Sequence, residues 1–383
     1  MRYISIFLGS IILVIGVYVA GVYMNLYGEL EEPGVSVNSE LPKSLLQNKL
    51  IAQKPFGKTK QILFGDTHVH TTYSTDAFFW SLPIMNGEGP HPISDACDFA
   101  RFCSNLDFWV STDHAEAQTP RKWKSIKEAV RNCNAPTDSK EPDLVTFLGF
   151  EWTQVGNTAE SHYGHKNVMF LDIEESKVPK RPIGAGGIAT NGMRNTLPNQ
   201  AKMLRPAAFL DFENRHRYFN FLSFAEELQG GKYCEEGVSS KLLDEDCYES
   251  ADTPQDLFRK LNELNFPAIV IPHGNTWGFY SPPGITLDKQ LEPDFNDDNL
   301  QILFEVMSGH GNSEEYRPWR AVNQDEEENL TCPEPTKDYL PSCWRAGEII
   351  YERCINSNLN EGTCLSRAED ARNNYAVMGV AGH

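Results

Sequence analysis

The chain has 383 residues, 40% of them hydrophobic, and a formal net charge of −19. This length and apolar content allow one large hydrophobic core or two ordinary domains. Because so acidic a chain repels phosphate backbones, the composition argues against nucleic acid as a partner. The sequence does not indicate an oligomeric state.

The N-terminal segment is a charge-free apolar run at residues 4–24, directly behind Arg2. Its length suits a membrane-spanning helix, and no clear small-residue cleavage site stands near Ala20. We therefore predict a transmembrane anchor at residues 1–24, with a cleaved signal peptide as the alternative. Both interpretations imply export, either as a membrane-anchored protein with an extracytoplasmic (periplasmic) domain or as a secreted protein. Residues 25–60 are predicted to be a linker because they carry Pro, Gly, Asn, Ser and Lys without sustained periodicity.

The nine cysteines fit an oxidising compartment. Local disulfides are expected between cysteines that are close in the sequence, and one more within a more N-terminal group of three. The odd total leaves a free thiol or a partner outside the chain. The expected pairs are Cys234 with Cys247, Cys332 with Cys343, and Cys354 with Cys364, and the further group is Cys97, Cys103 and Cys133.

From residue 61 onward, strand-like apolar runs alternate with helical stretches. One helix is predicted at residues 120–132, where Trp123, Ile126 and Val130 share a face, and another around residues 221–228. Strands separated by helical spacers indicate parallel β/α units, so residues 61–383 are predicted to form one α/β domain. Residues 181–250 are too long for an ordinary loop in a compact domain, so we expect them to form an insertion or lid. The predicted strands are residues 61–65, 106–110, 144–150, 167–171, 267–271 and 302–306.

Two histidines one residue apart, His68 and His70, follow the first predicted strand, and Asp76 comes a short loop later. A strand that breaks into a loop can turn both imidazoles toward one point. Imidazole with carboxylate is the ligand set of zinc, manganese or iron rather than calcium. The motif therefore predicts a catalytic metal site, with turn capping as the alternative role for Asp76.

The same ligand types recur along the chain. His114, Glu151 and His273 each follow a predicted strand, and His165 directly precedes one. In an α/β barrel the C-terminal ends of different strands meet on one face, so these side chains are expected to form one cluster with the first two histidines. Any one of them alone has an ordinary explanation, such as a hydrogen-bonded core histidine or a helix cap.

Five further residues are assigned by their neighbours in the sequence. Asp113 and Asp66 are expected to orient imidazoles from behind, although direct ligation is an open alternative. Asn275, Trp277 and Tyr280 follow the last histidine and are candidates for the wall of a substrate pocket, or for a packed turn.

This set, in this order, resembles the polymerase-and-histidinol-phosphatase (PHP) superfamily of metal-dependent phosphoesterases. The family's opening His-x-His and its Thr-Asp-His motif correspond to His68-Val69-His70 and Thr112-Asp113-His114. Its later glutamate corresponds to Glu151, and its next two histidines to His165, preferred over His162, and His273. More closely, residues 149–153, 164–168, 305–314 and 343–348 look like an exported PHP-like family, domain of unknown function 3604, over about residues 61–383.

The resemblance implies a distorted (β/α)7-type TIM-like barrel that holds two or three divalent transition-metal ions, zinc, manganese or iron. His68 and His70 would hold one metal, and Glu151 would bridge it to a second at His165 and His273. Asp76 and His114 would hold a third. The superfamily closes its site with a late Asp-x-His motif, which does not occur after Glu314. We therefore expect the barrel to be incomplete at its C-terminus and the chain to be part of a longer protein.

The expected function is hydrolysis of a small anionic ester, a phosphate or sulfate ester, by a metal-bridging hydroxide. Glu151, His114 and His273 are the expected catalytic residues. One alternative is a C–N hydrolase of the amidohydrolase type, which is disfavoured because Glu151 stands where those enzymes carry a bridging lysine. The other alternative is an exported metal-binding protein without catalytic activity.

Overall fold

The computed structural model of the protein describes residues 2–52, 62–136, 142–274, 277–278, 282, 285, 287–308, 311–312, 323–324, 330–337 and 339–375. Two of the predicted pocket residues, Asn275 and Tyr280, lie outside the described residues, and Trp277 is described only as part of a strand.

Twelve strands are present in the described parts of the chain, most of them short. They are β1 (Gly65–Val69), β2 (Phe108–Ser111), β3 (Val145–Thr153), β4 (His165–Phe170), β5 (Ile183–Ala185), β6 (Glu249–Ala251), β7 (Ala268–His273), β8 (Trp277–Gly278), β9 (Met307–Ser308), β10 (Gly311–Asn312), β11 (Asn323–Gln324) and β12 (Leu330–Thr331).

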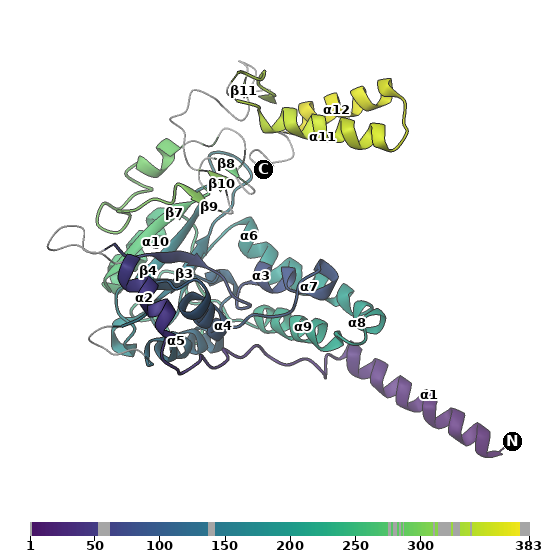
Figure 1. Cartoon of the computed structure of the whole chain (residues 1–383). Coiled ribbons are helices and arrows are strands. Elements are labelled where there is room, and N and C mark those ends of the chain that lie inside the picture. The colour runs from purple at the N-terminus through teal and green to yellow at the C-terminus, as the bar shows by residue number, and fades with distance from the viewer. Residues whose placement is uncertain are drawn as a thin grey trace.

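Helices surround these strands and follow them at the C-terminus (Figure 1). They are α1 (Arg2–Tyr23), α2 (Lys43–Ala52), α3 (Thr75–Trp80), α4 (Ile93–Asp98), α5 (Pro120–Asn134), α6 (Ile188–Asn191), α7 (Leu197–Ala201), α8 (Ala207–Leu210), α9 (Arg215–Gln229), α10 (Pro254–Leu264), α11 (Ser342–Asn356) and α12 (Glu361–Tyr375).

The main sheet has five strands in the order β1-β2-β3-β4-β7. Strands β1, β2 and β3 run parallel, whereas β4 is antiparallel to both of its neighbours. Neighbouring strands lie about 4.8 Å apart, so a flat sheet would separate its edge strands β1 and β7 by roughly 19 Å. The ring centroids of His68 on β1 and His273 on β7 are only 4.2 Å apart, so the sheet is strongly curled.

The predicted TIM-like barrel is therefore wrong: the described residues form a curled half-barrel with a mixed sheet. Residues 154–164 connect β3 to β4 without a helix, and this short connection, with Gly156, Asn157 and Gly164, makes an antiparallel pair. The strand predicted at residues 302–306 does not form. That segment runs beside β7 instead, where the amide of Glu305 donates to the carbonyl of Pro272 at 3.2 Å.

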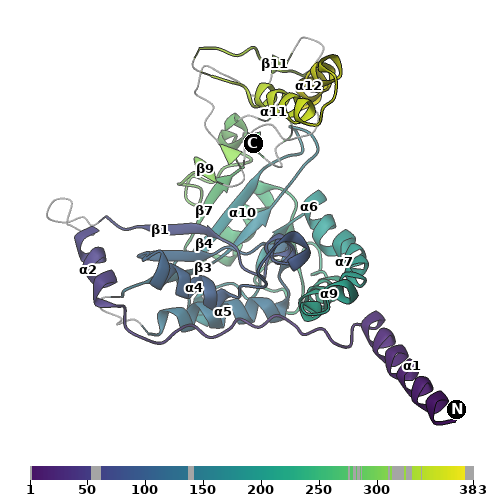
Figure 2. The same cartoon turned by 45° about the vertical axis from the view of Figure 1, so that its right-hand side comes forward.

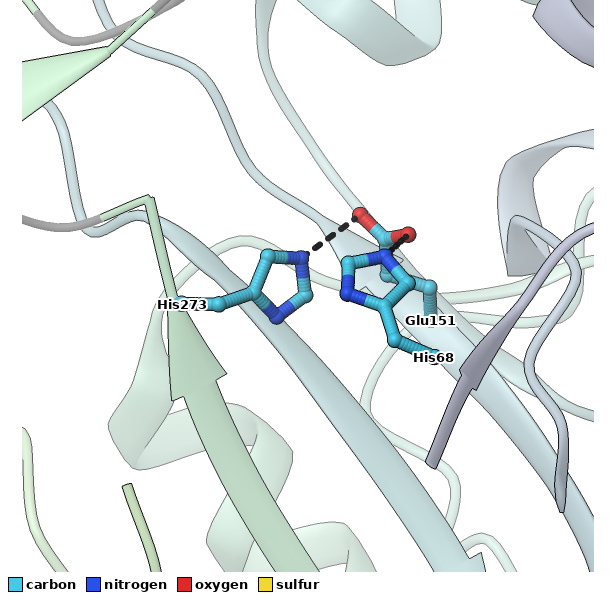
Figure 3. A group of neighbouring side chains, drawn as sticks. All are labelled: His68, Glu151 and His273. Carbon is cyan, nitrogen blue, oxygen red and sulfur yellow. Dashed lines mark ion pairs between the residues drawn. The ribbon is translucent and has the colours of Figure 1, made fainter. Parts of the chain in front are cut away.

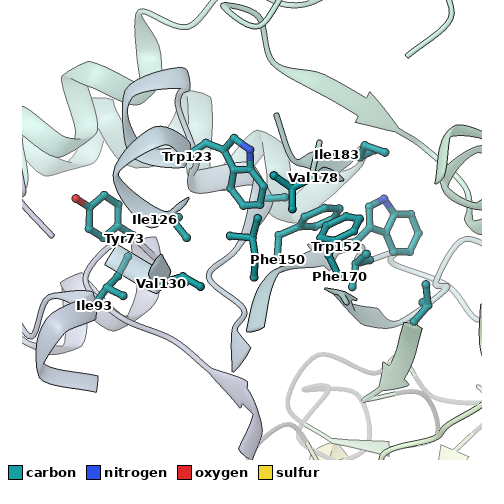
Figure 4. Close-up of a cluster of buried hydrophobic side chains, with 14 of the residues drawn as sticks. Tyr73, Ile93, Trp123, Ile126, Val130, Phe150, Trp152, Phe170, Val178 and Ile183 are labelled. Carbon is teal, nitrogen blue, oxygen red and sulfur yellow. The ribbon is translucent and has the colours of Figure 1, made fainter. Parts of the chain in front are cut away.

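The core lies between the sheet and α5 (Figure 4). The hydroxyl of Thr119 caps the first turn of α5 by accepting from the amide of Lys122. As predicted, Trp123, Ile126 and Val130 are all buried on one face of this helix. Trp123 packs against Phe150 of β3 with ring centroids 6.2 Å apart, so the helix covers the face of the sheet directly behind the strand that carries Glu151.

The insertion at residues 181–250 contains β5, β6 and the helices α6–α9, and it forms a second hydrophobic cluster. Val22 of α1 is buried in this cluster. Residues 25–60, predicted to be a linker, include α2 and make hydrogen bonds to the domain. The amide of Ser94 donates to the carbonyl of Pro33, and the amide of Val37 donates to Asp98. Figure 2 shows this segment running along the body between α1 and α2.

Four disulfides are present, and the three predicted local pairs are confirmed. In the group of three, Cys97 pairs with Cys133 between α4 and α5, which leaves Cys103 as a free, exposed cysteine. The apolar N-terminal helix and the disulfides are consistent with an exported protein.

Candidate metal centre

The ends of four strands bring the predicted ligands to one edge of the curled sheet. His68 lies near the end of β1, His273 ends β7, and Glu151 lies toward the end of β3. His165 begins β4, but because β4 is antiparallel, its first residue lies at the same edge and pairs directly with His273. The register of β3, β4 and β7 thus aligns Thr153, His165 and His273, which places both imidazoles two residue positions from Glu151 along the strands.

Glu151 is the centre of the cluster, and its side chain has no solvent exposure. Its Oε1 atom lies 2.6 Å from Nδ1 of His165 and 3.4 Å from Nε2 of His273. Its Oε2 atom lies 2.7 Å from Nε2 of His70 and 3.4 Å from Nε2 of His68. The two carboxylate oxygens therefore face different pairs of histidines. Figure 3 shows His68 and His273 approaching this carboxylate from different strands.

A second group lies beside the first. Asp76 sits in the first turn of α3, where its Oδ1 accepts from the amide of Ala77 at 2.7 Å. Its Oδ2 lies 3.2 Å from Nε2 of His114, and its Oδ1 lies 3.9 Å from Nδ1 of His70. The Asp76 carboxylate thus accepts a hydrogen bond within the first turn of α3 and also lies beside two imidazoles with which it could share a metal ion. His114 also lies 3.5 Å from Oε2 of Glu151, which joins the two groups.

Ligand atoms in two triads are close enough to share one metal ion each. In each triad, the candidate ligand atoms all lie within 4.8 Å of one another. The triads are His68, Glu151 and His273, and His70, Asp76 and His114. This grouping separates His68 from His70, which the family resemblance had placed on a single metal.

The carboxylates raise the pKa of His68 and His70, whereas burial and the charge of His68 lower the pKa of His273 to about 4. Burial alone would raise the pKa of Glu151, but the charges of His114 and His165 outweigh it and hold that pKa well below its ordinary value. Burial opposes protonation of His68, yet hydrogen bonds to Glu151 and Glu305 raise its pKa to about 9. A protonated imidazole beside a carboxylate holds its proton where a metal cation could bind instead. This set of imidazoles and carboxylates therefore fits divalent cations.

Asp113 holds the loop between β1 and α3 in place. Its carboxylate accepts from the amide and hydroxyl of Thr71, at 2.7 and 2.9 Å, and from the hydroxyl of Ser74 at 2.8 Å. The Ser74 hydroxyl in turn accepts from the amide of His114 at 3.0 Å. Asp113 therefore acts on the ligands through backbone position. The other predicted supporting residue, Asp66, is exposed and accepts from the amide of His68 at 2.9 Å.

Glu305 belongs to the site, although we did not predict it as a site residue. Its Oε2 lies 3.0 Å from Nδ1 of His68, the ring nitrogen that does not face Glu151. It follows the apolar run at residues 302–304, so it carries the same pattern of an acidic ligand type after an apolar run. Glu305 stands inside the strand predicted at residues 302–306, and it enters the sequence prediction only through the family resemblance of residues 305–314.

His162 lies outside the cluster. Its Nδ1 accepts from the amide of Gly156 at 3.3 Å, and burial, helped by the charge of His165, lowers its pKa to about 4. This histidine supports the loop between β3 and β4. The preference for His165 as the ligand agrees with this geometry.

The fold and site define a mixed α/β protein whose histidine and carboxylate clusters could bind metal ions. The family model described as "Protein of unknown function (DUF3604)" matches residues 57–119. The matched residues include β1, β2 and four residues of the two triads: His68, His70, Asp76 and His114. None of the curated proteins matches the chain.

Proposed function

We propose that the protein is an exported, metal-dependent hydrolase of small phosphate or sulfate esters. The observation that carries this proposal is the position of Glu151, whose two oxygens face two separate sets of histidines. Glu151 would thus be a ligand shared by two cations, which when bound would stabilise the attacking and leaving oxygens of an in-line displacement at phosphorus. The resemblance to PHP phosphoesterases points the same way, and sulfate esters are isosteric.

Two or three divalent ions of zinc, manganese or iron suit the ligands. The triad of His68, Glu151 and His273 would hold one ion, and that of His70, Asp76 and His114 another. His165, next to Oε1 of Glu151, would complete the first site or serve a third. When bound, such ions activate water near neutral pH and neutralise charge on the oxygens of the ester.

The chain's own residues hold the ligands in position. Glu305 can accept a hydrogen bond from Nδ1 of His68, which leaves Nε2 facing Glu151, where it would serve as a metal ligand. The hydroxyl of Thr153 contacts Nδ1 of His114 in the same way. In a chain of net charge −19, the bound cations would also supply the local positive field that holds an anionic substrate.

The contacts of Lys166 weigh further against the amidohydrolase alternative. Lys166 follows His165 on β4 and is fully buried. Its Nζ donates to Oε1 of Gln290 at 2.6 Å and to Oε1 of Gln301 at 2.8 Å, away from the triads. A metal-binding protein without activity remains the competing hypothesis, and the experiment below separates the two.

The test uses full-length protein, stripped with a chelator and reloaded with zinc, manganese or iron(II). We expect bound metal and turnover of p-nitrophenyl phosphate or p-nitrophenyl sulfate; in His70→Asn, turnover should be lost and the metal content should fall. The matched control is His91→Asn, because His91 lies in the same part of the chain but its side chain is 67% exposed. Metal binding without turnover of either ester would favour the non-catalytic alternative. Full activity of His70→Asn would contradict the proposal.

A further inference from the structure

The C-terminal end of α1 packs against the insertion at residues 181–250. Val22 is fully buried in the cluster formed with α9, and the ring of Tyr18 lies 6.0 Å from Phe209 and 6.2 Å from Phe212. Beyond the helix, the side-chain amide of Asn25 donates to the hydroxyl of Ser223 at 3.0 Å. These contacts fix α1 to the helices α8 and α9, and both views show it projecting from them (Figures 1 and 2).

An exposed apolar surface, here called the α8 face, surrounds this attachment. It consists of Met203, Phe209, Leu210 and Phe212, with exposed fractions of 78%, 40%, 89% and 55%. Contiguous apolar exposure of this kind marks a surface that is covered in the working protein. The segment that carries the α8 face has an excess of basic residues, although the whole chain has a net charge of −19. Residues 202–217 contain the cations Lys202, Arg205, Arg215 and Arg217 against the anions Asp211 and Glu213.

The length of α1 sets the depth of the α8 face. A helix rises about 1.5 Å per residue and the hydrocarbon core is about 30 Å thick, so a spanning helix needs about 20 residues. A membrane-spanning segment therefore takes up nearly all of the 22 residues of α1, which ends at Tyr23. Tyr18 lies five residues earlier, roughly 7 Å down the helix axis. Phe209 and Phe212, which contact Tyr18, must then lie at the boundary between headgroups and hydrocarbon.

We propose that the α8 face inserts into the surface of the bilayer that α1 spans, and that Lys202 and Arg205 bind anionic lipid headgroups. The guanidinium of Arg205 lies 5.4 Å from the ring centroid of Tyr23, at the level expected for an interfacial aromatic residue. Amphipathic surfaces of this kind typically enter the boundary by about 5–10 Å. Contact between the α8 face and the bilayer thereby holds the domain at a fixed orientation to the membrane. This inference does not depend on the proposed catalytic activity.

The experiment uses the full-length protein in vesicles of phosphatidylethanolamine and phosphatidylglycerol. The variant carries Cys103→Ser and Leu210→Cys, and the new thiol is labelled with an environment-sensitive fluorophore. The matched control is Leu171→Cys with the same label, because Leu171 follows β4 and is 67% exposed. A doxyl-labelled lipid quenches from the bilayer, and iodide quenches from water. Position 203 provides a second probe if the label at position 210 disturbs folding.

We expect the ratio of lipid quenching to iodide quenching to be at least roughly threefold higher at position 210 than at 171, because the face would lie in the membrane boundary. Equal ratios at the two positions would overturn the proposal. So would protection from both quenchers, because a second copy or another protein would then cover the face. A mature N-terminus after Ala20 would also overturn it, since α1 would be absent.

Discussion

Glu305 and His68 form a pair in which the carboxylate lies 3.0 Å from Nδ1 of the imidazole, while Nε2 of the same ring lies 3.4 Å from Oε2 of Glu151. The two residues are far apart in the sequence, on β1 and on the segment beside β7. A carboxylate behind a ligating histidine fixes its tautomer and increases its basicity. The pair would therefore hold His68 in position for a cation bound beside Glu151.

The first prediction concerns this pair. Glu305→Gln keeps the shape of the side chain but removes its charge, so we expect metal affinity to fall by about 10- to 100-fold. Competition with a chromophoric chelator measures the change. Glu292→Gln is the control, because Glu292 is exposed in the same part of the chain. Unchanged affinity in Glu305→Gln would show that Glu305 does not support the ligand.

The second prediction concerns the bridge. Because Oε1 of Glu151 faces His273 of the first triad and Oε2 faces His70 of the second, Glu151→Gln should reduce the metal content of both triads together. Asp76→Asn should affect only the triad that contains His70 and His114. Metal-to-protein ratios after gel filtration distinguish the two patterns. Equal, partial losses in both variants would mean that Glu151 serves a single site.

The third prediction concerns Asp113, which is buried and accepts hydrogen bonds from Thr71 and Ser74. Asp113→Ala leaves those donors buried without their acceptor, so the free energy of unfolding should fall by about 1–3 kcal/mol. Denaturant titration of the metal-free protein measures this loss. The control is Asp95→Ala, whose carboxylate is half exposed and should change stability little. A loss as small as that of the control would contradict the role of Asp113 in holding the loop.

The fourth prediction concerns pH. Burial lowers the pKa of Lys122 on α5 to about 7, against an ordinary value of 10.5. Between these values the unfolded chain holds a proton that the folded protein has released, so this group makes stability increase with pH, by up to about 1.4 kcal/mol per pH unit. Lys122→Met should remove that increase.

Thermal unfolding at pH 7.5 and pH 9.5, in a Cys103→Ser background that prevents thiol exchange, compares the variants. Lys124→Met is the control, because Lys124 lies on the same helix and is exposed. If Lys122→Met and the control show the same change with pH, Lys122 does not carry the effect.

Much of the candidate site could be predicted from local sequence. His68, His70, His114, Glu151 and His273 each follow or end an apolar run, and a strand end is a place where polar side chains can converge. The prediction missed Glu305 because it stands inside the strand predicted at residues 302–306, whereas the other candidate ligands were sought at strand ends. The assignment of Asp113 to an imidazole also differed from its contacts, because the hydroxyls of Thr71 and Ser74 are reached only when the loop folds back.

The sequence by itself determined the apolar N-terminal helix, the local disulfides, the helix α5 and the types of ligand, because each depends on neighbouring residues or on a short periodicity. The tertiary structure alone decided the direction of β4 and the curl of the sheet. Strand direction depends on pairing across the β3–β4 connection, and curl accumulates over five strands, so neither is written in any one segment. Together they place His165 and His273 around Glu151 in a half-barrel with a mixed sheet, where the sequence had suggested a TIM-like barrel that is incomplete at its C-terminus.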